Sequence, residues 1–192
     1  MENSKEKIIY INFNATIGQE ETRAFMEFCM SVIHEHNPDA FYFLFASPGG
    51  DVDSGIVLYN FLKSLPQKIV MHNIGSVDSI GIVVFLAGDE RYASPHTSFL
   101  FHPIDHTPEE SKLDLKKLEE IESKIKKDED KICSIVCSDT DISEDEMRQF
   151  FEQGEEKSEG FAKDRKLLHA IQPIQINKKD IFLNFYFKKE KH

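Results

Sequence analysis

Three stretches of the chain are almost wholly apolar and rich in β-branched and aromatic residues, which is typical of buried strands. They cover residues 7–13 (KIIYINF), 39–47 (DAFYFLFAS) and 67–75 (QKIVMHNIG). Apolar residues at helical spacing fill the segments between them, 19–37 and 53–65, and predict two helices. This alternation of strand and helix on one continuous core predicts an α/β layered fold.

Local signals refine this outline. Acidic residues open the first helix, where the positive end of the helix dipole favours negative charge. We expect Asp53 or Ser54 to cap the second helix, because both side chains accept hydrogen bonds from free N–H groups. The following residues predict a tight turn at 75–81 (GSVDSIG), a buried helix over 82–89 and two further strands within 90–104.

The pattern changes near residue 106. Residues 107–137 predict a long charged helix with one narrow apolar stripe, formed by Leu113, Leu118, Ile121, Ile125 and Ile132. Such a stripe packs either on the helix's own domain or against a partner molecule, and the sequence leaves both open. Residues 141–175 predict two shorter helices, one opened by a capping box from Ser143 to Glu146. The tail, 180–192, is predicted to add a strand or to dock on a surface.

A length of 192 residues suits a single domain over 1–192. We assign residues 7–106 and 141–175 to its core, about 107–138 to a projecting helix and about 176–192 to a C-terminal extension. The apolar content of 40% is that of a globular protein. A net charge of −11 gives no electrostatic reason to bind nucleic acid or an anionic membrane, so we expect neither as a partner.

Cysteine and histidine usage excludes further classes. The spacing of the three cysteines, Cys29, Cys133 and Cys137, is not that of a zinc site. An odd number of cysteines suits a protein of the reducing cytoplasm. We predict no signal peptide and no membrane span. The HEH motif at 34–36 and the pair His102 and His106 lack a third ligand in sequence reach. We therefore expect no metal and no cofactor.

Two glycine-containing loops and one histidine carry candidate chemistry. In SPGG, Gly49 and Gly50 let the backbone turn sharply and present N–H groups. Ser79 is predicted at a helix start, beside N–H groups that favour negative charge. His102 closes an apolar strand, where a histidine can act as a base near neutral pH. Each feature alone is common in turns and caps, whereas together they predict a nucleophile, a base and an oxyanion site.

At this point the sequence resembles the Clp protease proteolytic subunit family, the serine peptidases that assemble into closed rings. Three blocks carry the resemblance in order and spacing: SPGGDVDSGIVLYNFLKSL, GSVDSIGIVVFLAG and RYASPHTSFLFHP. It covers roughly residues 7–105 in register and continues more loosely over the long helix, which is similar to that family's inter-ring handle, and over FAKDRKLLHAI. It implies the layered β-superhelix shared with crotonases.

The resemblance assigns roles to individual residues. Ser79 takes the place of the nucleophile and His102 that of the general base, while N–H groups of Gly49 or Gly50 and of Ile80 form the oxyanion hole. It also implies peptide or unfolded protein substrates, a homo-oligomeric ring or pair of stacked rings, and an AAA+ unfoldase as a candidate partner.

The sequence departs from the family in three places. Aligning FAKDRKLLHAI with the last core helix puts Ser158 where the family has the triad aspartate, so Glu159 or Glu156 is the candidate to orient His102. Only residues 1–6 precede the first predicted strand, which argues against dependence on an unfoldase. The C-terminal extension is longer than usual, and we expect it to replace or block a docking surface.

Two other functions remain open. The first is a catalytically impaired ring subunit that serves as a scaffold or modulates an active paralogue, and Ser158 favours it. The second is an acyl-CoA enzyme of the crotonase type, which would hold a thioester oxyanion with the glycine loops. The Ser79 and His102 pair argues against this last alternative.

Overall fold

The computed structural model describes residues 6–104 and 114–187. Their element order alternates strand and helix in the first half and becomes mainly helical afterwards. The strands are β1 Ile8–Asn14, β2 Ala40–Ser47, β3 Lys68–Asp78, β4 Glu90–Ala93, β5 Ser98–Leu100, β6 Glu156–Ser158, β7 Ala170–Ile171 and β8 Ile181–Asn184. The helices are α1 Gln19–His36, α2 Val52–Ser64, α3 Ile80–Phe85, α4 Leu115–Asp139, α5 Glu144–Gln153 and α6 Glu159–Asp164. The layered α/β fold predicted from the alternation is confirmed.

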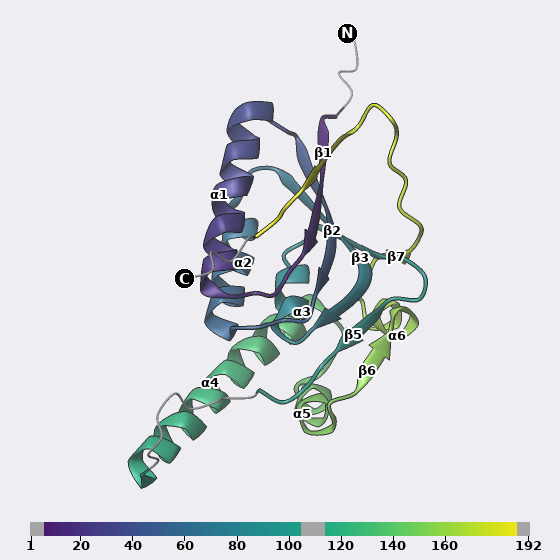
Figure 1. Cartoon of the computed structure of the whole chain (residues 1–192). Helices are drawn as coiled ribbons and strands as arrows, with labels where there is room; N and C mark the ends of the chain where they lie inside the picture. Colours follow the sequence, from purple (N-terminus) through teal and green to yellow (C-terminus); the bar gives the residue numbers. More distant parts are fainter. Residues whose placement is uncertain (1–5, 105–113, 188–192) are drawn as a thin grey trace.

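One mixed sheet forms the centre of the fold. Its path runs β6-β5-β3-β2-β1-β8, and β4 joins β3 to β7. All pairs are parallel except β5 with β6. In Figure 1, α1 and α2 lie side by side on one face of this sheet, and α4 reaches away from it. Phenylalanine rings fill the layer between the sheet and the helices, including Phe13, Phe25, Phe43 and Phe85.

The strand β3 differs from the prediction in a way that matters for chemistry. The segment 75–81 is not a tight turn, because β3 continues to Asp78 and pairs Ser76 to Asp78 with β5. The extra ladder bonds favour extended backbone over a turn. The chain changes direction only at Ser79, and α3 begins at Ile80. The two strands expected within 90–104 are present, but each pairs with β3 rather than with the other.

Helix ends follow local chemistry. The capping box at Ser143 is confirmed, since its hydroxyl accepts from Glu146 N–H while the Glu146 carboxylate accepts from Ser143 N–H. The predicted cap of α2 was wrong by two residues or more. Asp51 caps this helix and accepts from Ser54 N–H at 2.8 Å, so Asp53 and Ser54 lie inside the first turn.

The apolar stripe of α4 divides into two parts. Ile132 is buried, as is Val136 one turn further on, and this half of the helix contacts α3 and α5. Leu118, in contrast, is 48% exposed, and Leu115 is exposed as well. Leu113 lies outside the described residues. The stripe therefore packs on its own domain at one end and presents apolar side chains to solvent at the other.

The C-terminal extension supplies an added strand, as one of the two predictions for it stated. The strand β8 pairs in parallel with β1, from Ile9 opposite Ile181 to Asn12 opposite Asn184. The next residue, Phe185, is buried beneath α1, where its ring contacts those of Phe13 and Phe25. The added strand thus covers the β1 edge, which would otherwise expose unpaired backbone groups. Among the described residues, no helix is long and apolar enough to cross a membrane.

A neutral histidine is built into the sheet. His72 is 0% exposed, and its Nδ1 and Nε2 atoms lie 2.6 Å from Tyr42 Oη and 3.1 Å from Ser94 Oγ. Burial lowers the pKa of His72 to about 4, because a charged imidazolium loses its hydration there.

This histidine should make the protein less stable in mild acid. Below its ordinary pKa of about 6.5, the unfolded chain takes up a proton that the folded chain does not bind until the pH nears 4. The free energy of unfolding should therefore fall as the pH drops from about 6.5 towards 4, by roughly 3 kcal/mol in total. Urea unfolding at several pH values measures this slope. A His72→Gln variant should show a smaller slope, and equal slopes would contradict the prediction.

Candidate active site

The backbone at Ser79 brings its side chain out of the sheet. Ser79 has φ 56° and ψ −130°, a conformation that non-glycine residues rarely adopt. Its N–H donates to Leu100 O at 2.8 Å, which fixes the bend against β5. Its side chain caps no N–H group of α3. The strained conformation therefore serves to place a free hydroxyl at the junction of strand and helix, as in nucleophile elbows.

His102 reaches the same point from the neighbouring strand. In the parallel ladder Asp78 lies opposite Leu100, so the ladder ends one residue before Ser79 and two residues before His102. Ser79 and His102 line the same cavity of about 290 Å³, together with Pro48, Gly50 and Asp51. A second, much smaller and mainly apolar hollow also contains both residues. The structure thus brings the predicted nucleophile and base together.

No hydrogen bond joins Ser79 Oγ to His102 within the described residues. Such bonds often tighten only when a substrate is bound. The partner that His102 does have is a backbone group, because its Nδ1 lies 2.7 Å from Pro103 O. A carbonyl oxygen only accepts, so Nδ1 carries the proton and Nε2 keeps its lone pair. This is the tautomer that a general base acting through Nε2 requires.

The glycine loop approaches Ser79 closely. Gly49 and Gly50 have φ of 85° and 149°, both in the region that favours glycine. A Cβ atom on Gly49 would lie 2.7 Å from both Asp78 O and Ser79 Cβ. A larger side chain therefore does not fit at position 49. The backbone of the loop packs directly against Ser79.

The two glycines differ as oxyanion donors. The N–H of Gly49 donates to Ser47 Oγ at 3.1 Å, so this group is already engaged. Within the described residues, no protein group accepts a hydrogen bond from the N–H of Gly50 or Ile80. These two N–H groups are available to a negatively charged oxygen, and they favour Gly50 over Gly49 for that role.

The carboxylates predicted to orient His102 lie elsewhere. Ser158 lies opposite Ser98 in the antiparallel ladder of β5 and β6, and Ser98 is four residues before His102. The Ser158 hydroxyl also caps α6 by accepting a hydrogen bond from Phe161 N–H. The Glu159 carboxylate accepts from His96 N–H at 3.0 Å, and this bond lowers its pKa. Glu156 is exposed and has no hydrogen bond to His102. Within the described residues neither Glu159 nor Glu156 hydrogen-bonds His102, so the orienting role expected of them stays a prediction.

Sequence reasoning missed two charged residues of the cavity. Lys124 and Asp128 of α4 line it, and Asp128 is buried between Lys124 and Lys131, whose Nζ atoms lie 3.0 and 2.9 Å from its oxygens. The same lysines hold Asp53, and their hydrogen bonds lower the pKa of that carboxyl. These ion pairs could have been predicted from the sequence, because Asp128 follows Lys124 by four residues and precedes Lys131 by three, which places the three side chains on one face of a helix. Asp128 thus binds both lysines within α4, and the same lysines connect α4 to Asp53 of α2.

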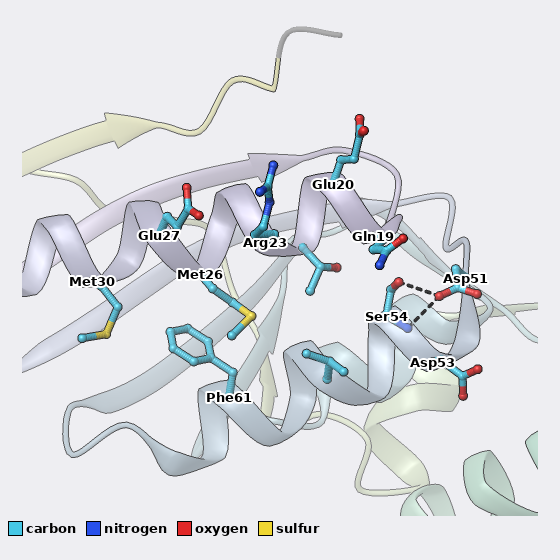
Figure 2. Close-up of a pocket in the computed structure, with 12 residues that line it drawn as sticks. Gln19, Glu20, Arg23, Met26, Glu27, Met30, Asp51, Asp53, Ser54 and Phe61 are labelled. Carbon is cyan, nitrogen blue, oxygen red and sulfur yellow. Dashed lines mark hydrogen bonds between the residues drawn. The ribbon is translucent and has the colours of Figure 1, made fainter. Parts of the chain in front are cut away.

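A more voluminous groove lies apart from this site. It has a volume of about 1270 Å³ and runs between α1 and α2. Figure 2 shows Met26, Met30 and Phe61 inside it and charged residues such as Glu20 and Asp53 around it. It contains neither Ser79 nor His102. We take the smaller cavity as the candidate active site, because reactive side chains and free N–H groups converge there.

The remaining candidates are settled by position. Cys133 and Cys137 lie on one face of α4, as predicted, with their Sγ atoms 3.7 Å apart. Burial raises the pKa of the Cys133 thiol to about 12, so it stays protonated. Within residues 6–104 and 114–187, no group of three or more His, Cys, Asp or Glu side chains could hold a metal ion. His106 lies outside these ranges.

Comparison with known proteins agrees with this geometry. The model of the Clp protease family matches residues 4–162. The chain is 33% identical over 75 residues to ATP-dependent Clp protease proteolytic subunit 2 of Pseudomonas aeruginosa, a match covering 38% of this chain and 37% of that protein. It is 26% identical over 100 residues to subunit 1 of Leifsonia xyli, with 51% and 50% covered. The chain thus spans between about a third and a half of the length of these curated relatives.

The fold is shared with a solved structure. A mutant of ClpP1 from Listeria monocytogenes superposes with a TM-score of 0.75 at 19% identity, over 86% of this chain and 92% of that one. This likeness confirms the crotonase-like α/β fold that the resemblance implied. With the family model spanning most of the chain, including the SPGG loop, Ser79 and His102, the protein belongs to the Clp protease family.

Proposed function

We propose that this chain is a serine peptidase that hydrolyses peptide bonds through Ser79 and His102. The observation that carries the proposal is the free hydroxyl of Ser79 at a strained backbone position, in one cavity with His102 and beside the free N–H groups of Gly50 and Ile80. Membership of the Clp protease family supports it.

The proposed mechanism has two stages, acylation of Ser79 and hydrolysis of the acyl-serine, and His102 transfers the proton in both. His102 Nε2 takes the proton of Ser79 Oγ, and the oxygen attacks the peptide carbonyl. The N–H groups of Gly50 and Ile80 stabilise the oxyanion that forms. His102 then gives the proton to the leaving amine, and the C–N bond breaks to leave an acyl-serine. His102 then takes a proton from water, which attacks the ester; the acyl C–Oγ bond breaks, His102 returns the proton to Ser79 Oγ, and the carboxylic acid leaves.

Assembly and partners belong to the same proposal. The exposed half of the α4 stripe, Leu115 and Leu118, supports contact with other copies of the chain in a ring or stacked rings. Relatives are named as subunits of an ATP-dependent protease, so we propose peptides or unfolded proteins as substrates and an AAA+ unfoldase as the partner that delivers them. Three free cysteines support a reducing compartment such as the cytoplasm.

A fluorophosphonate probe tests the proposal directly. The probe should add once to the folded protein, as read by intact mass, and should not add to a Ser79→Ala variant. Light scattering of the same sample at micromolar concentration should show a species several times heavier than the 22.2 kDa chain. If light scattering shows only a monomer, the proposed ring assembly is wrong. If folded, assembled protein forms no adduct, the proposed peptidase activity is wrong.

The second candidate is a catalytically impaired ring subunit that acts as a scaffold or modulates an active paralogue. One observation favours it: within the described residues, no carboxylate hydrogen-bonds His102. Loss of the orienting acid costs triad enzymes about 10⁴ in kcat. An assembled protein that takes up no probe would establish this alternative.

A further inference from the structure

The group that holds His102 is a backbone carbonyl rather than an acid. Pro103 O accepts from Nδ1 at 2.7 Å, which selects the tautomer needed for a base acting through Nε2. A neutral carbonyl stabilises the imidazolium formed during catalysis less than a carboxylate does, because charge-assisted hydrogen bonds are about twice as strong. The structure therefore retains the orientation of the base without the negative charge that would strengthen it.

The residue facing His102 across the ladder is Gly154. Leu100 pairs with Glu156 in the antiparallel register, and two residues further along this register brings His102 opposite Gly154. A Cβ atom built on Gly154 would lie 3.9 Å from His102 Cβ and 3.8 Å from Pro103 Cδ. Both distances are ordinary van der Waals contacts, so a side chain fits there. A carboxylate one bond beyond that Cβ comes within reach of the imidazole.

We infer that position 154 is the vacant place of the third catalytic group, and that the Pro103 carbonyl orients His102 in its stead. This inference rests on the proposed function of Ser79 and His102. It deepens that proposal by placing the missing acid beside His102 rather than at Ser158, which lies opposite Ser98. It also makes Gly154 the position that sets how strongly the base acts.

Glycine at 154 has a conformational explanation of its own. The residue ends α5 in the left-handed conformation with φ 60°, and its N–H donates to Phe150 O at 3.0 Å. After glycine, asparagine and aspartate adopt this conformation most readily. Gly154→Asp and Gly154→Asn therefore share nearly the same shape and backbone strain, and they differ in charge. They form a matched pair for the test.

The experiment measures the pKa of His102 and the reactivity of Ser79 in both variants. In Gly154→Asp, NMR titration should give a His102 pKa at least one unit higher than in Gly154→Asn, because a nearby carboxylate favours the imidazolium. The rate of probe addition to Ser79 should be about tenfold higher or more, with its pH midpoint moved upward by the same shift. If position 154 had a purely structural role, the His102 pKa and the pH midpoint of probe addition would be the same in both variants.

The two measurements separate the inference from the proposed function. An unchanged His102 pKa in Gly154→Asp relative to Gly154→Asn would overturn the inference, whether or not Ser79 reacts. A raised pKa without probe addition in any variant would uphold the position of the missing acid and overturn the peptidase. A raised pKa together with faster addition would support both.

Discussion

Replacing His102 with alanine should lower the rate of probe addition to Ser79 by a factor of about 10² to 10⁴. Among the described residues that line its cavity, the other ionisable groups are already engaged. Asp51 accepts from Ser54 N–H, and Lys124 and Asp128 are paired with each other. The rate constant for mass increase at fixed probe concentration measures this effect directly. It does not depend on knowing the natural substrate.

His34→Ala is the matched control for this prediction. His34 is an exposed histidine on α1 and contributes to neither cavity that contains Ser79. Its removal should leave the rate within twofold of the unmodified protein. If His102→Ala reacts as fast as His34→Ala, His102 is not the base, and the mechanism proposed for Ser79 would have to be abandoned.

Phe185→Ala should lower the free energy of unfolding by about 3 to 5 kcal/mol. The Phe185 ring is 8% exposed and its centroid lies 5.0 Å from that of Phe25 and 5.7 Å from that of Phe13. Its removal leaves a cavity beneath α1 and loosens the attachment of β8 to β1, where Phe185 N–H donates to Asn12 O at 3.0 Å. Urea unfolding followed by circular dichroism gives the value.

Phe182, which lies in β8 just before Phe185, provides the control. It is 40% exposed, so Phe182→Ala removes the same side chain with little loss of buried surface and should cost less than about 1 kcal/mol. Equal losses in the two variants would mean that β8 is not packed as described. A large difference would establish that the C-terminal extension belongs to the folded core, which the sequence alone left undecided between a strand and a docking segment.

Features that depend on near neighbours could be predicted from the amino-acid sequence. Runs of β-branched and aromatic residues marked β1, β2 and β3, because a strand buried on both faces needs apolar side chains at every position. The capping box of α5 could be read from Ser143 and Glu146, since three residues of spacing bring each side chain to the other's N–H. The order of the glycine loop, Ser79 and His102, together with the family resemblance, was also enough to predict that Ser79 and His102 line one cavity.

The way in which distant segments meet could not be predicted from the sequence and is seen in the folded chain. Pairing with β5 extends β3 to Asp78 and leaves the whole change of direction to Ser79. The register of β5 with β6 places Gly154, not Ser158 or Glu159, beside His102. The physical reason is common to both: ladder register is set by bonds between residues far apart in the chain, and a shift of a few residues moves every side chain to a new neighbour. The hydrogen-bond partner of His102 and its neighbour across the ladder therefore followed from the fold and not from the alignment of one segment.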